Sequence, residues 1–495
     1  MRIRTLALAA AVVVLSGLGG LGLVAGDPQG LGDIQSVVRA PNPQPGWTFP
    51  DGTEDAPAVS TDDMAPGLPA TVEPISFSKT LRTYRTDDAT GTQVGTTTWR
   101  VVRGTGNCCE NHLGVTQSGR LLDYGGAYIN FSDNQGATWQ RVRPAEPLVG
   151  PEGTIVQAPG GDIVGITWDP YTGDRVLAFK MDGATKTWSY MYTPLHTPFY
   201  DREWIAVIPG PLTVGGQTIP YLTVIRGAWP AKDVWYYSVD GLHYTVAGNK
   251  VLTQMAGGAG VSEWLPTTPD ADADWTQPIS EMGVAPLNTG GALAWRVDTL
   301  DSFGGANWWT VEPGSLLWTR FRLGNGSELP QGRLVQDSRG WTHLVNVQGG
   351  TVTYNISQDG GQTWTSTSTP LPADHNVENW DFHANGALGI TAVAVHAHNS
   401  ISGKDQDLVL KYGTACGQPE LTRTYLVGLG DLDAASGLGA SIRFDFATMV
   451  ILPDGRIATS MMDTLHTSPA LAVEVSTALN PGYEPPLLSC GVPAP

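Results

Sequence analysis

The chain has 495 residues, of which 41% are hydrophobic and only 15% are charged, and it contains 61 glycines and 36 prolines. This composition excludes a disordered chain and a coiled coil, and it leaves few stretches long enough for a helix of several turns. The net charge of −19, without any run of basic residues, argues against nucleic acid and anionic membrane surfaces as partners. We therefore expect an all-β fold.

The N-terminus predicts export. Arg2 and Arg4 precede an apolar run over residues 6–24, which ends in small residues before Asp27. This order is typical of a secretory signal, assigned to residues 1–26, although the run is also long enough for an uncleaved membrane anchor. Residues 27–75 are rich in Pro, Gly, Asp and Ala without a sustained period, which favours a flexible spacer. The expected location is secreted, or extracellular.

One unit recurs over residues 76–482: a short apolar strand, a tight turn with glycine, a second apolar strand, and then two more strands. The turns are Ser118-Gly119, Gly160-Gly161, Gly215-Gly216, Gly290-Gly291, Arg339-Gly340, Asn385-Gly386 and Asp454-Gly455. Repeats of this length and content predict a β-propeller of about seven four-stranded blades, or six if one turn is misread. The widest spacing predicts an insertion loop over residues 255–280.

Four cysteines, in an exported chain, predict two disulfides. Cys416 with Cys490 is the preferred pair, because it would hold the tail over residues 483–495 after the last blade. Cys108 and Cys109 are adjacent and fit a vicinal bridge, so the pairing stays open. The spacing indicates no zinc site, and the chain has no phosphate loop or dinucleotide fingerprint, so no metal and no cofactor is expected.

The innermost strand of each propeller blade lines the central channel, and polar residues begin most of these strands. The catalytic candidates among them are Glu110, His112, Glu152, Asp201, Glu203, Asp381, His383 and Asp445. The substrate-binding candidates are Arg202, Trp204, Trp380 and Arg443. Because positions i and i+2 of a strand share a face, Asp381 and His383 are expected to point to the same side.

Two interpretations compete for these residues. In one, carboxylates and imidazoles at the blade entrances accept hydrogen bonds from backbone N–H groups of neighbouring loops and line a wet channel. In the other, several converge on a glycosidic bond as general acid, base or nucleophile, for which two carboxyl groups about 5–10 Å apart suffice.

Two segments have the frame Ser-x-Asp-x-Gly-x-Thr-Trp. Residues 357–364 match it in full, residues 132–139 carry Asn134 in the Asp position, and residues 237–244 and 181–188 are degenerate copies. The frame resembles the Asp-box, or bacterial neuraminidase repeat, of sialidase-like propellers. It suits a hairpin, since the Asp or Asn bonds its own turn, the glycine takes a positive φ and the Trp packs between sheets. In such propellers the box lies on an outer hairpin, away from the central funnel.

The resemblance implies an exo-sialidase, with three arginines for a substrate carboxylate, a Tyr nucleophile activated by Glu, and an Asp acid/base. Arg202, Arg226 and Arg443 are available for the triad, but the Arg-Ile-Pro motif expected before the first box is missing. We therefore expect a secreted glycosidase that acts on an extracellular glycan. The alternatives are a non-catalytic glycan- or protein-binding propeller and a polysaccharide lyase that uses His112, His383 and a Tyr. The oligomeric state is open.

Overall fold

The computed structural model describes only part of the chain. The described residues are 37–38, 65–103, 112–125, 128–145, 153–168, 175–194, 204–214, 217–229, 232–246, 254–255, 282–286, 292–297, 306–311, 318–320, 322–323, 333–358, 363–401, 404–427, 448–463 and 468–495. Within these ranges the secondary structure is β-strand, with one short 3-10 turn at Pro159–Gly161. No helix in the described ranges has the length and apolarity needed to cross a membrane.

The fold is a β-propeller, and each blade is a sheet of consecutive antiparallel strands that we name by its innermost strand. The β6 blade contains β6 (His112–Val115), β7 (Leu121–Gly125), β8 (Tyr128–Ser132) and β9 (Trp139–Arg143). The β10 blade contains β10 (Gly153–Gln157), β11 (Ile163–Trp168), β12 (Arg175–Met181) and β13 (Trp188–Pro194). The β14 blade contains β14 (Trp204–Val214), β15 (Gln217–Trp229), β16 (Lys232–Ser238) and β17 (Thr245–Val246).

The second part of the chain continues the same pattern. The β19 blade contains β19 (Met282–Pro286), β20 (Ala292–Val297), β21 (Ala306–Val311) and β22 (Trp318–Arg320), with β18 (Gln254–Met255) parallel to β22. The β24 blade contains β24 (Arg333–Gln336), β25 (Thr342–Gln348), β26 (Thr351–Ser357) and β27 (Thr365–Pro370). The β28 blade contains β28 (His375–Asn385), β29 (Ile390–Asn399), β30 (Lys404–Gly413) and β31 (Glu420–Val427). The β32 blade contains β32 (Met449–Ile451), β33 (Ile457–Asp463) and β34 (Ser468–Leu479).

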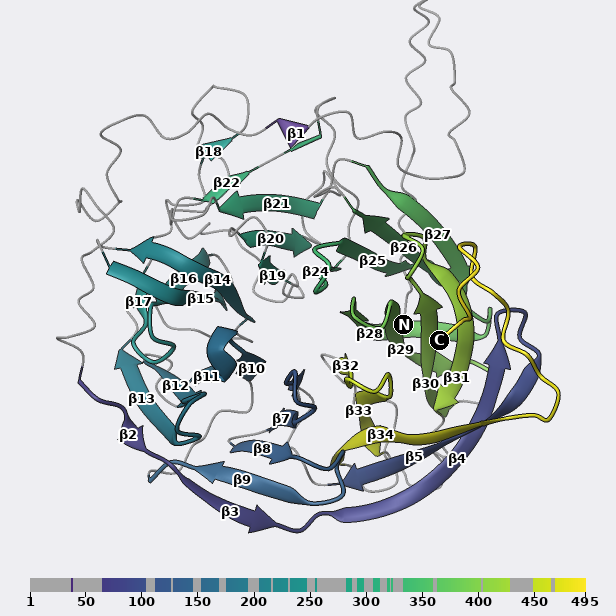
Figure 1. The fold of residues 1–495 in the computed structure, drawn as a ribbon, viewed down its shortest axis with the longest axis horizontal. Helices are drawn as coiled ribbons and strands as arrows, with labels where there is room; N and C mark the ends of the chain where they lie inside the picture. The colour runs from purple at the N-terminus through teal and green to yellow at the C-terminus, as the bar shows by residue number, and fades with distance from the viewer. Residues whose placement is uncertain are drawn as a thin grey trace, which may run out of the picture.

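The inner strands close a ring around the centre of the molecule (Figure 1). Contacts run from one inner strand to the next in the order β6, β10, β14, β19, β24, β28, β32 and back to β6. The count of seven blades stays a prediction, because the segments that join the β14, β19 and β24 blades lie outside the described residues, as does most of the loop predicted over 255–280.

An N-terminal belt, residues 65–103, lies along the outer edges of several blades. It comprises β2 (Leu68–Pro69), β3 (Thr71–Ile75), β4 (Ser78–Asp88) and β5 (Gln93–Arg103). Strand β2 pairs with β13, β3 with β9, and β4 with both β31 and β5, while β5 completes the β32 blade beside β34. A further short pair joins β1 (Val37–Val38) to β23 (Arg322–Leu323). The belt covers unpaired edges and ties the last blade to the start of the chain (Figure 1).

Residues 65–75 fall within the spacer that the sequence predicts, whereas the structure has β2 and β3 there. The two strands are short, contain proline and are largely exposed, so they lack the apolar alternation by which a strand is recognised. Their backbone pairs with blade edges. Backbone pairing at a blade edge places little constraint on side-chain type, so the sequence pattern does not indicate these strands.

The core lies between blades, because both faces of each middle strand are covered. In β12, Leu177 and Phe179 pack into the cluster shared with the β6 blade, whereas Ala178 packs towards the β14 blade. Strand β11 alternates likewise, with Ile163 in the first cluster and Val164 in the second. Successive side chains point to opposite faces of a strand, and both faces are buried here. The strands are therefore nearly continuous apolar runs in the sequence.

The tight turns that the sequence predicts lie between the first and second strands of their blades. Gly119, Gly340 and Gly455 have φ angles of 87°, 83° and 85°, a backbone conformation that favours glycine. The turns at 215–216 and 290–291 lie outside the described residues, between β14 and β15 and between β19 and β20.

Hairpins between third and fourth strands carry the segments that resemble the Asp-box. In residues 132–139, Ser132 Oγ accepts from Gly136 N–H at 2.8 Å and Asn134 Oδ1 accepts from Thr138 N–H at 2.8 Å, with Trp139 buried beneath. In residues 237–244, Asp240 Oδ1 accepts two backbone N–H groups at 2.9 Å, and Tyr244 takes the buried aromatic position. Residues 359–362 of the full match lie outside the described residues.

The C-terminal tail is fastened to the β28 blade. Cys416 and Cys490 form a disulfide with 5.3 Å between their Cα atoms, which is the pairing preferred from the sequence. Glu420 accepts from Ser489 N–H, and the buried Leu488 packs against Gly413. Cys108 and Cys109 lie outside the described residues.

Candidate functional site

The candidate site predicted from the sequence is only partly described. The candidates outside the described residues are Glu110, Glu152, Asp201, Arg202, Glu203, Arg443 and Asp445. Trp204 begins β14, and only its backbone is described. The side chains of His112, Trp380, Asp381 and His383 can be placed, and each lies on an inner strand of the ring.

His112, the first residue of β6, binds the next blade. Its Nδ1 accepts the backbone N–H of Ile155 on β10 at 3.2 Å. An imidazole that accepts at Nδ1 carries its proton at Nε2, so His112 is in the neutral Nε2–H form. The contact replaces a hydrogen bond that the edge of β10 would otherwise make with water.

Asp381 and His383 share one face of β28, as the i, i+2 spacing predicts, and both bind β32. Asp381 Oδ2 accepts from Met449 N–H at 2.8 Å, and His383 Nδ1 accepts from Ile451 N–H at 3.3 Å. Burial, with a smaller contribution from the nearby His343, lowers the pKa of His383 to about 4. His383 is therefore neutral at pH 7 and serves as an acceptor.

Thr448 also accepts a backbone N–H from a neighbouring blade, although it was not among the candidates predicted from the sequence. Its Oγ1 lies immediately before β32 and accepts the backbone N–H of Leu113 on β6 at 3.2 Å. Asp381, Thr448 and His112 thus bridge β28 to β32, β32 to β6, and β6 to β10 in succession. An inner strand is an edge strand, and these side chains satisfy N–H groups that have no partner in their own sheet.

Arg333 begins β24 and completes what we call the entrance cluster, formed by Arg333, Trp380, Asp381 and His383. Arg333 donates to Asp381 Oδ1 at 3.2 Å and to the carbonyl oxygen of Trp380, and its guanidinium lies 4.6 Å from the centre of the Trp380 ring system. The arginine side chain is only 6% exposed, whereas the Asp381 carboxylate is 21% exposed. A nearly buried cation therefore holds a partly exposed acid and indole in fixed positions.

A second cluster lies at the other end of the β24 blade, and we call Asp337, Arg339, Trp341 and His343 the turn cluster. His343 Nε2 lies 2.9 Å from Asp337 Oδ2, and Arg339 Nε donates to the same oxygen at 2.8 Å. Burial alone would raise the pKa of Asp337, but the hydrogen bonds from His343 and Arg339 hold it at about 2. The Arg339 guanidinium stacks 3.7 Å from the Trp341 ring centre.

The turn cluster continues into a buried chain of hydrogen bonds. Tyr354 Oη lies 2.7 Å from His343 Nδ1 and 2.6 Å from Thr391 Oγ1 on the β28 blade. Burial raises the pKa of Tyr354 well above its usual value and lowers that of His343. This Tyr–His pair has the composition that a lyase requires, but both side chains are enclosed by protein, so its role is to join two blades.

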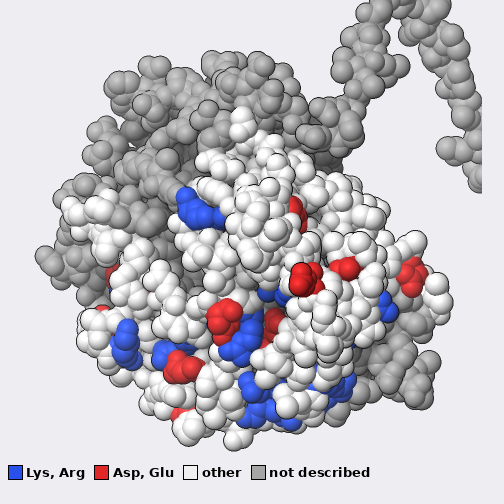
Figure 2. Space-filling view, turned by 45° about the vertical axis from the view of Figure 1, so that its right-hand side comes forward, with Lys and Arg blue, Asp and Glu red and all other residues white. Residues whose placement is uncertain are grey.

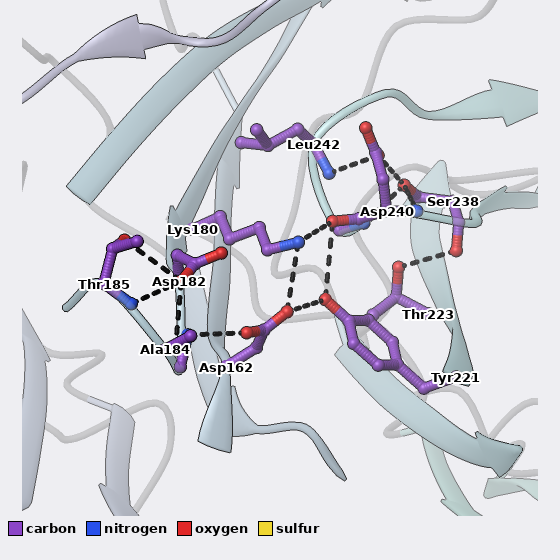
Figure 3. Close-up of polar contacts among 12 residues, drawn as sticks. Asp162, Lys180, Asp182, Ala184, Thr185, Tyr221, Thr223, Ser238, Asp240 and Leu242 are labelled. Carbon is purple, nitrogen blue, oxygen red and sulfur yellow. Dashed lines mark hydrogen bonds and ion pairs between the residues drawn. The ribbon is translucent and has the colours of Figure 1, made fainter. Parts of the chain in front are cut away.

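A third polar cluster joins the β10 and β14 blades, as Figure 3 shows. Tyr221 donates to Asp162 Oδ2 at 2.7 Å, and Lys180 Nζ lies 3.0 Å from the same oxygen and 2.9 Å from the carbonyl oxygen of Asp240. Lys180 and Asp162 are mostly buried. The sequence did not indicate this cluster, because its members come from four different strands and turns.

No group of three or more His, Cys, Asp or Glu side chains that could hold a metal ion occurs in the described part of the chain.

Comparison with known proteins found neither a matching family model nor a matching curated protein. Among solved structures, the chain is similar to YCF48 bound to D1 peptide (12% identity, TM-score 0.42, covering 76% of this chain and 95% of that one). It is also similar to an ulvan lyase of a new polysaccharide lyase family (10% identity, TM-score 0.41, covering 80% of this chain and 98% of that one). A third similar structure is the Aleuria aurantia lectin (10% identity, TM-score 0.36, covering 66% of this chain and 93% of that one). At these identities and scores we draw no argument about activity from them.

Proposed function

We propose that this protein is an exported β-propeller that binds a glycan at the end of the ring where the inner strands begin. Export is supported by the signal-like N-terminus and by a disulfide, which persists in oxidising compartments. The observation that carries the binding proposal is the entrance cluster, in which Arg333 fixes the partly exposed indole of Trp380 beside a partly exposed carboxylate.

A fixed aromatic ring next to a few oriented polar groups is the combination that small polar ligands require. The exposed part of the indole offers apolar contact to the C–H face of a sugar ring, and it loses little entropy on binding because Arg333 and Phe382 already hold the ring. The Asp381 carboxylate is available to accept hydrogen bonds from sugar hydroxyl groups. The site orients a ligand without having to rearrange.

The described groups favour binding over hydrolysis. Both oxygens of Asp381 have protein partners, and His112 and His383 each accept a backbone N–H at Nδ1. Their first role is to hold neighbouring blades together. Glycosidase activity therefore rests on the carboxylates outside the described residues, Glu110, Glu152, Asp201, Glu203 and Asp445, for which it remains a prediction from the sequence.

Binding is tested by titrating a panel of neutral and acidic polysaccharides into the wild type and into Trp380→Ala. We expect the variant to lose at least about tenfold in affinity, which corresponds to about 1.4 kcal/mol. Trp341→Ala is the matched control, since Trp341 also stacks on an arginine but lies at the opposite end of the blade, in the turn between β24 and β25. Equal affinities of wild type and Trp380→Ala would contradict the proposal.

Hydrolysis is tested separately by the release of reducing ends from each polysaccharide that binds. Glu110→Gln and Asp201→Asn are expected to abolish release while binding is retained. Release that both variants leave unchanged would show that these carboxylates do not act on the bond. A wild type that binds but releases nothing would identify a binding propeller.

A further inference from the structure

Tyr128, the first residue of β8, contacts two arginines of the neighbouring strand. The guanidinium carbons of Arg141 and Arg143 are 4.3 Å and 5.0 Å from the centre of its ring. The two arginines are at positions i and i+2 of β9, so they share one face of the strand. Their side chains are held by the ring in a fixed arrangement rather than spread into solvent.

Two acids among the described residues act on these arginines. Arg143 pairs through Nε with Glu73 of β3, and both side chains are about two-fifths exposed. Arg141 donates through Nε to the amide oxygen of Asn130 at 2.9 Å, and its Nη atoms donate no hydrogen bond within the described part of the chain. Asp123 is fully buried, accepts from Asn130, and its charge favours the protonated form of Arg141.

Burial lowers the pKa of Arg141, and the charge of Arg143 lowers it further. This direction agrees with the geometry: two like charges lie close together, and one of them is half-buried with its Nη groups unused. An anion that contacts both guanidinium groups would relieve the repulsion and accept hydrogen bonds from those N–H groups. Arginine pairs of this kind bind carboxylate and sulfate oxygens through paired hydrogen bonds.

Tyr128 and the two arginines lie at the end of the blade that we propose binds the glycan. His112 pairs with Tyr124 and Tyr124 with Ile129, so Tyr128 lies at the end of the blade where β6 begins. Lys and Arg side chains also gather along the lower rim in Figure 2, on the side where the belt strands β4 and β5 lie in Figure 1. Those two strands carry five basic residues, which are Lys79, Arg82, Arg85, Arg100 and Arg103.

We propose that Arg141 and Arg143, both held against the Tyr128 ring, form a subsite for a carboxylate or sulfate group of an acidic glycan. This inference rests on the proposed glycan-binding function and names the class of ligand. With a net charge of −19, the protein as a whole repels polyanions. The subsite therefore selects glycans by a spaced anionic group rather than by high charge density.

The test compares the wild type with the double variant Arg141→Gln/Arg143→Gln on three polysaccharides: neutral dextran, polygalacturonate as the carboxylated probe, and dextran sulfate as the sulfated probe. We expect the double variant to lose at least about tenfold in affinity for an acidic probe and to keep the wild-type affinity for any neutral glycan in the panel. The acidic probe that shows the larger loss identifies the group.

Two further variants make the test independent of folding defects. Arg120→Gln is the matched control, because Arg120 lies on the same blade, stacks 4.4 Å from Phe131 and pairs with Asp133, but at the opposite end. It should leave the affinity unchanged. Glu73→Gln removes the acid that competes for Arg143 and should raise the affinity for the acidic probe severalfold.

The outcomes separate this inference from the proposed function. If the wild type binds neutral glycans in a Trp380-dependent way but gains nothing from an acidic group, the subsite is refuted and glycan binding stands. Equal losses in Arg120→Gln and in the double variant would indicate unspecific charge attraction and would also refute the subsite. A wild type that binds no polysaccharide overturns both.

Discussion

The entrance cluster and the turn cluster contain the same four residue types, Asp, Arg, His and Trp, at opposite ends of neighbouring blades. They differ in which partner is buried. At the entrance the arginine side chain is 6% exposed and the carboxylate 21%, whereas in the turn cluster Arg339 is 22% exposed and Asp337 is fully buried. The entrance therefore offers an acid and an indole to solvent, and the turn cluster encloses its acid.

Because the two clusters contain the same residue types and differ in which partner is buried, residue type alone does not distinguish a binding site from a structural cluster. A buried carboxylate needs several donors to offset its lost hydration, and Asp337 has them in His343, Arg339 and the backbone N–H of Arg339. Asp381 is 21% exposed and therefore keeps part of its hydration. Because its loss of hydration is smaller, it depends less on its partners.

The largest expected effect is on stability, in Asp337→Ala. The variant leaves several donors of the cluster, on His343, on the Arg339 side chain and on the Arg339 backbone, without their acceptor, at about 1–3 kcal/mol for each buried one. Asp381→Ala should cost less, about 1–3 kcal/mol in all, because Arg333 keeps the carbonyl oxygen of Trp380 as an acceptor and its contact with the Trp380 ring. Urea unfolding at pH 7 measures both. Asp133→Ala, which breaks an exposed ion pair with Arg120, serves as the control and should change stability by less than about 1 kcal/mol. Equal costs for the two buried sites would erase the contrast between the clusters.

The second effect separates a buried histidine, His383, from a buried carboxylate, Asp337, by the pH at which each loses its contribution to stability. An unfolded histidine titrates near pH 6.5, and the pKa of His383 is about 4 in the folded protein, so between these values the unfolded chain binds more protons. The contribution of neutral His383 is thus present above pH 6.5 and is lost as the pH falls to 4. Asp337, with a pKa of about 2 against 3.8 when unfolded, loses its contribution only between pH 3.8 and 2.

His383→Asn keeps a side-chain acceptor but removes the titration. It should reduce the slope of unfolding free energy against pH between 4 and 6.5 by up to about 1.4 kcal/mol per pH unit, and it should leave the slope below pH 3.8 unchanged. Urea unfolding at half-unit pH steps measures the slope. If the variant keeps the wild-type slope in the upper window, another group is responsible for the acid sensitivity.

Much of the fold could be predicted from the sequence because the repeat has local causes. Turn glycines such as Gly119 and Gly455 require a positive φ, and each segment that resembles the Asp-box bonds its own hairpin, so these signals lie within a few residues. The belt could not be found in this way. Strand β3 is fixed by its backbone pairing with β9, some seventy residues away, and its side chains are largely exposed.

The positions of the candidate residues on the inner strands could be predicted from the sequence, but their role in joining blades could not. His112, Asp381 and His383 were identified as polar residues expected at the start of inner strands, although Asp381 and His383 lie in the second half of β28. The backbone N–H groups that these side chains accept belong to other blades. Thr448 shares that role and escaped notice, since a threonine in a strand is ordinary. The i, i+2 spacing of Arg141 and Arg143 can be seen in the sequence. Their contacts with Tyr128 and Glu73 cannot, because those two residues lie on other strands.

The smallest effect is expected from removing a single side-chain acceptor that bridges two inner strands. Thr448→Val preserves shape but removes the acceptor for Leu113 N–H, so we expect a loss of about 1–2 kcal/mol in unfolding free energy. Thr83→Val is the control: Thr83 is exposed and bonds only Thr98 across the belt, and its replacement should cost less than about 0.5 kcal/mol. Because Thr448 joins the last blade to the β6 blade, its loss should also speed amide hydrogen exchange at Leu113 more than at Ile155, whose acceptor His112 is intact. Equal exchange at the two amides would mean that the bridges are not independent and that the inner strands open as one cooperative unit.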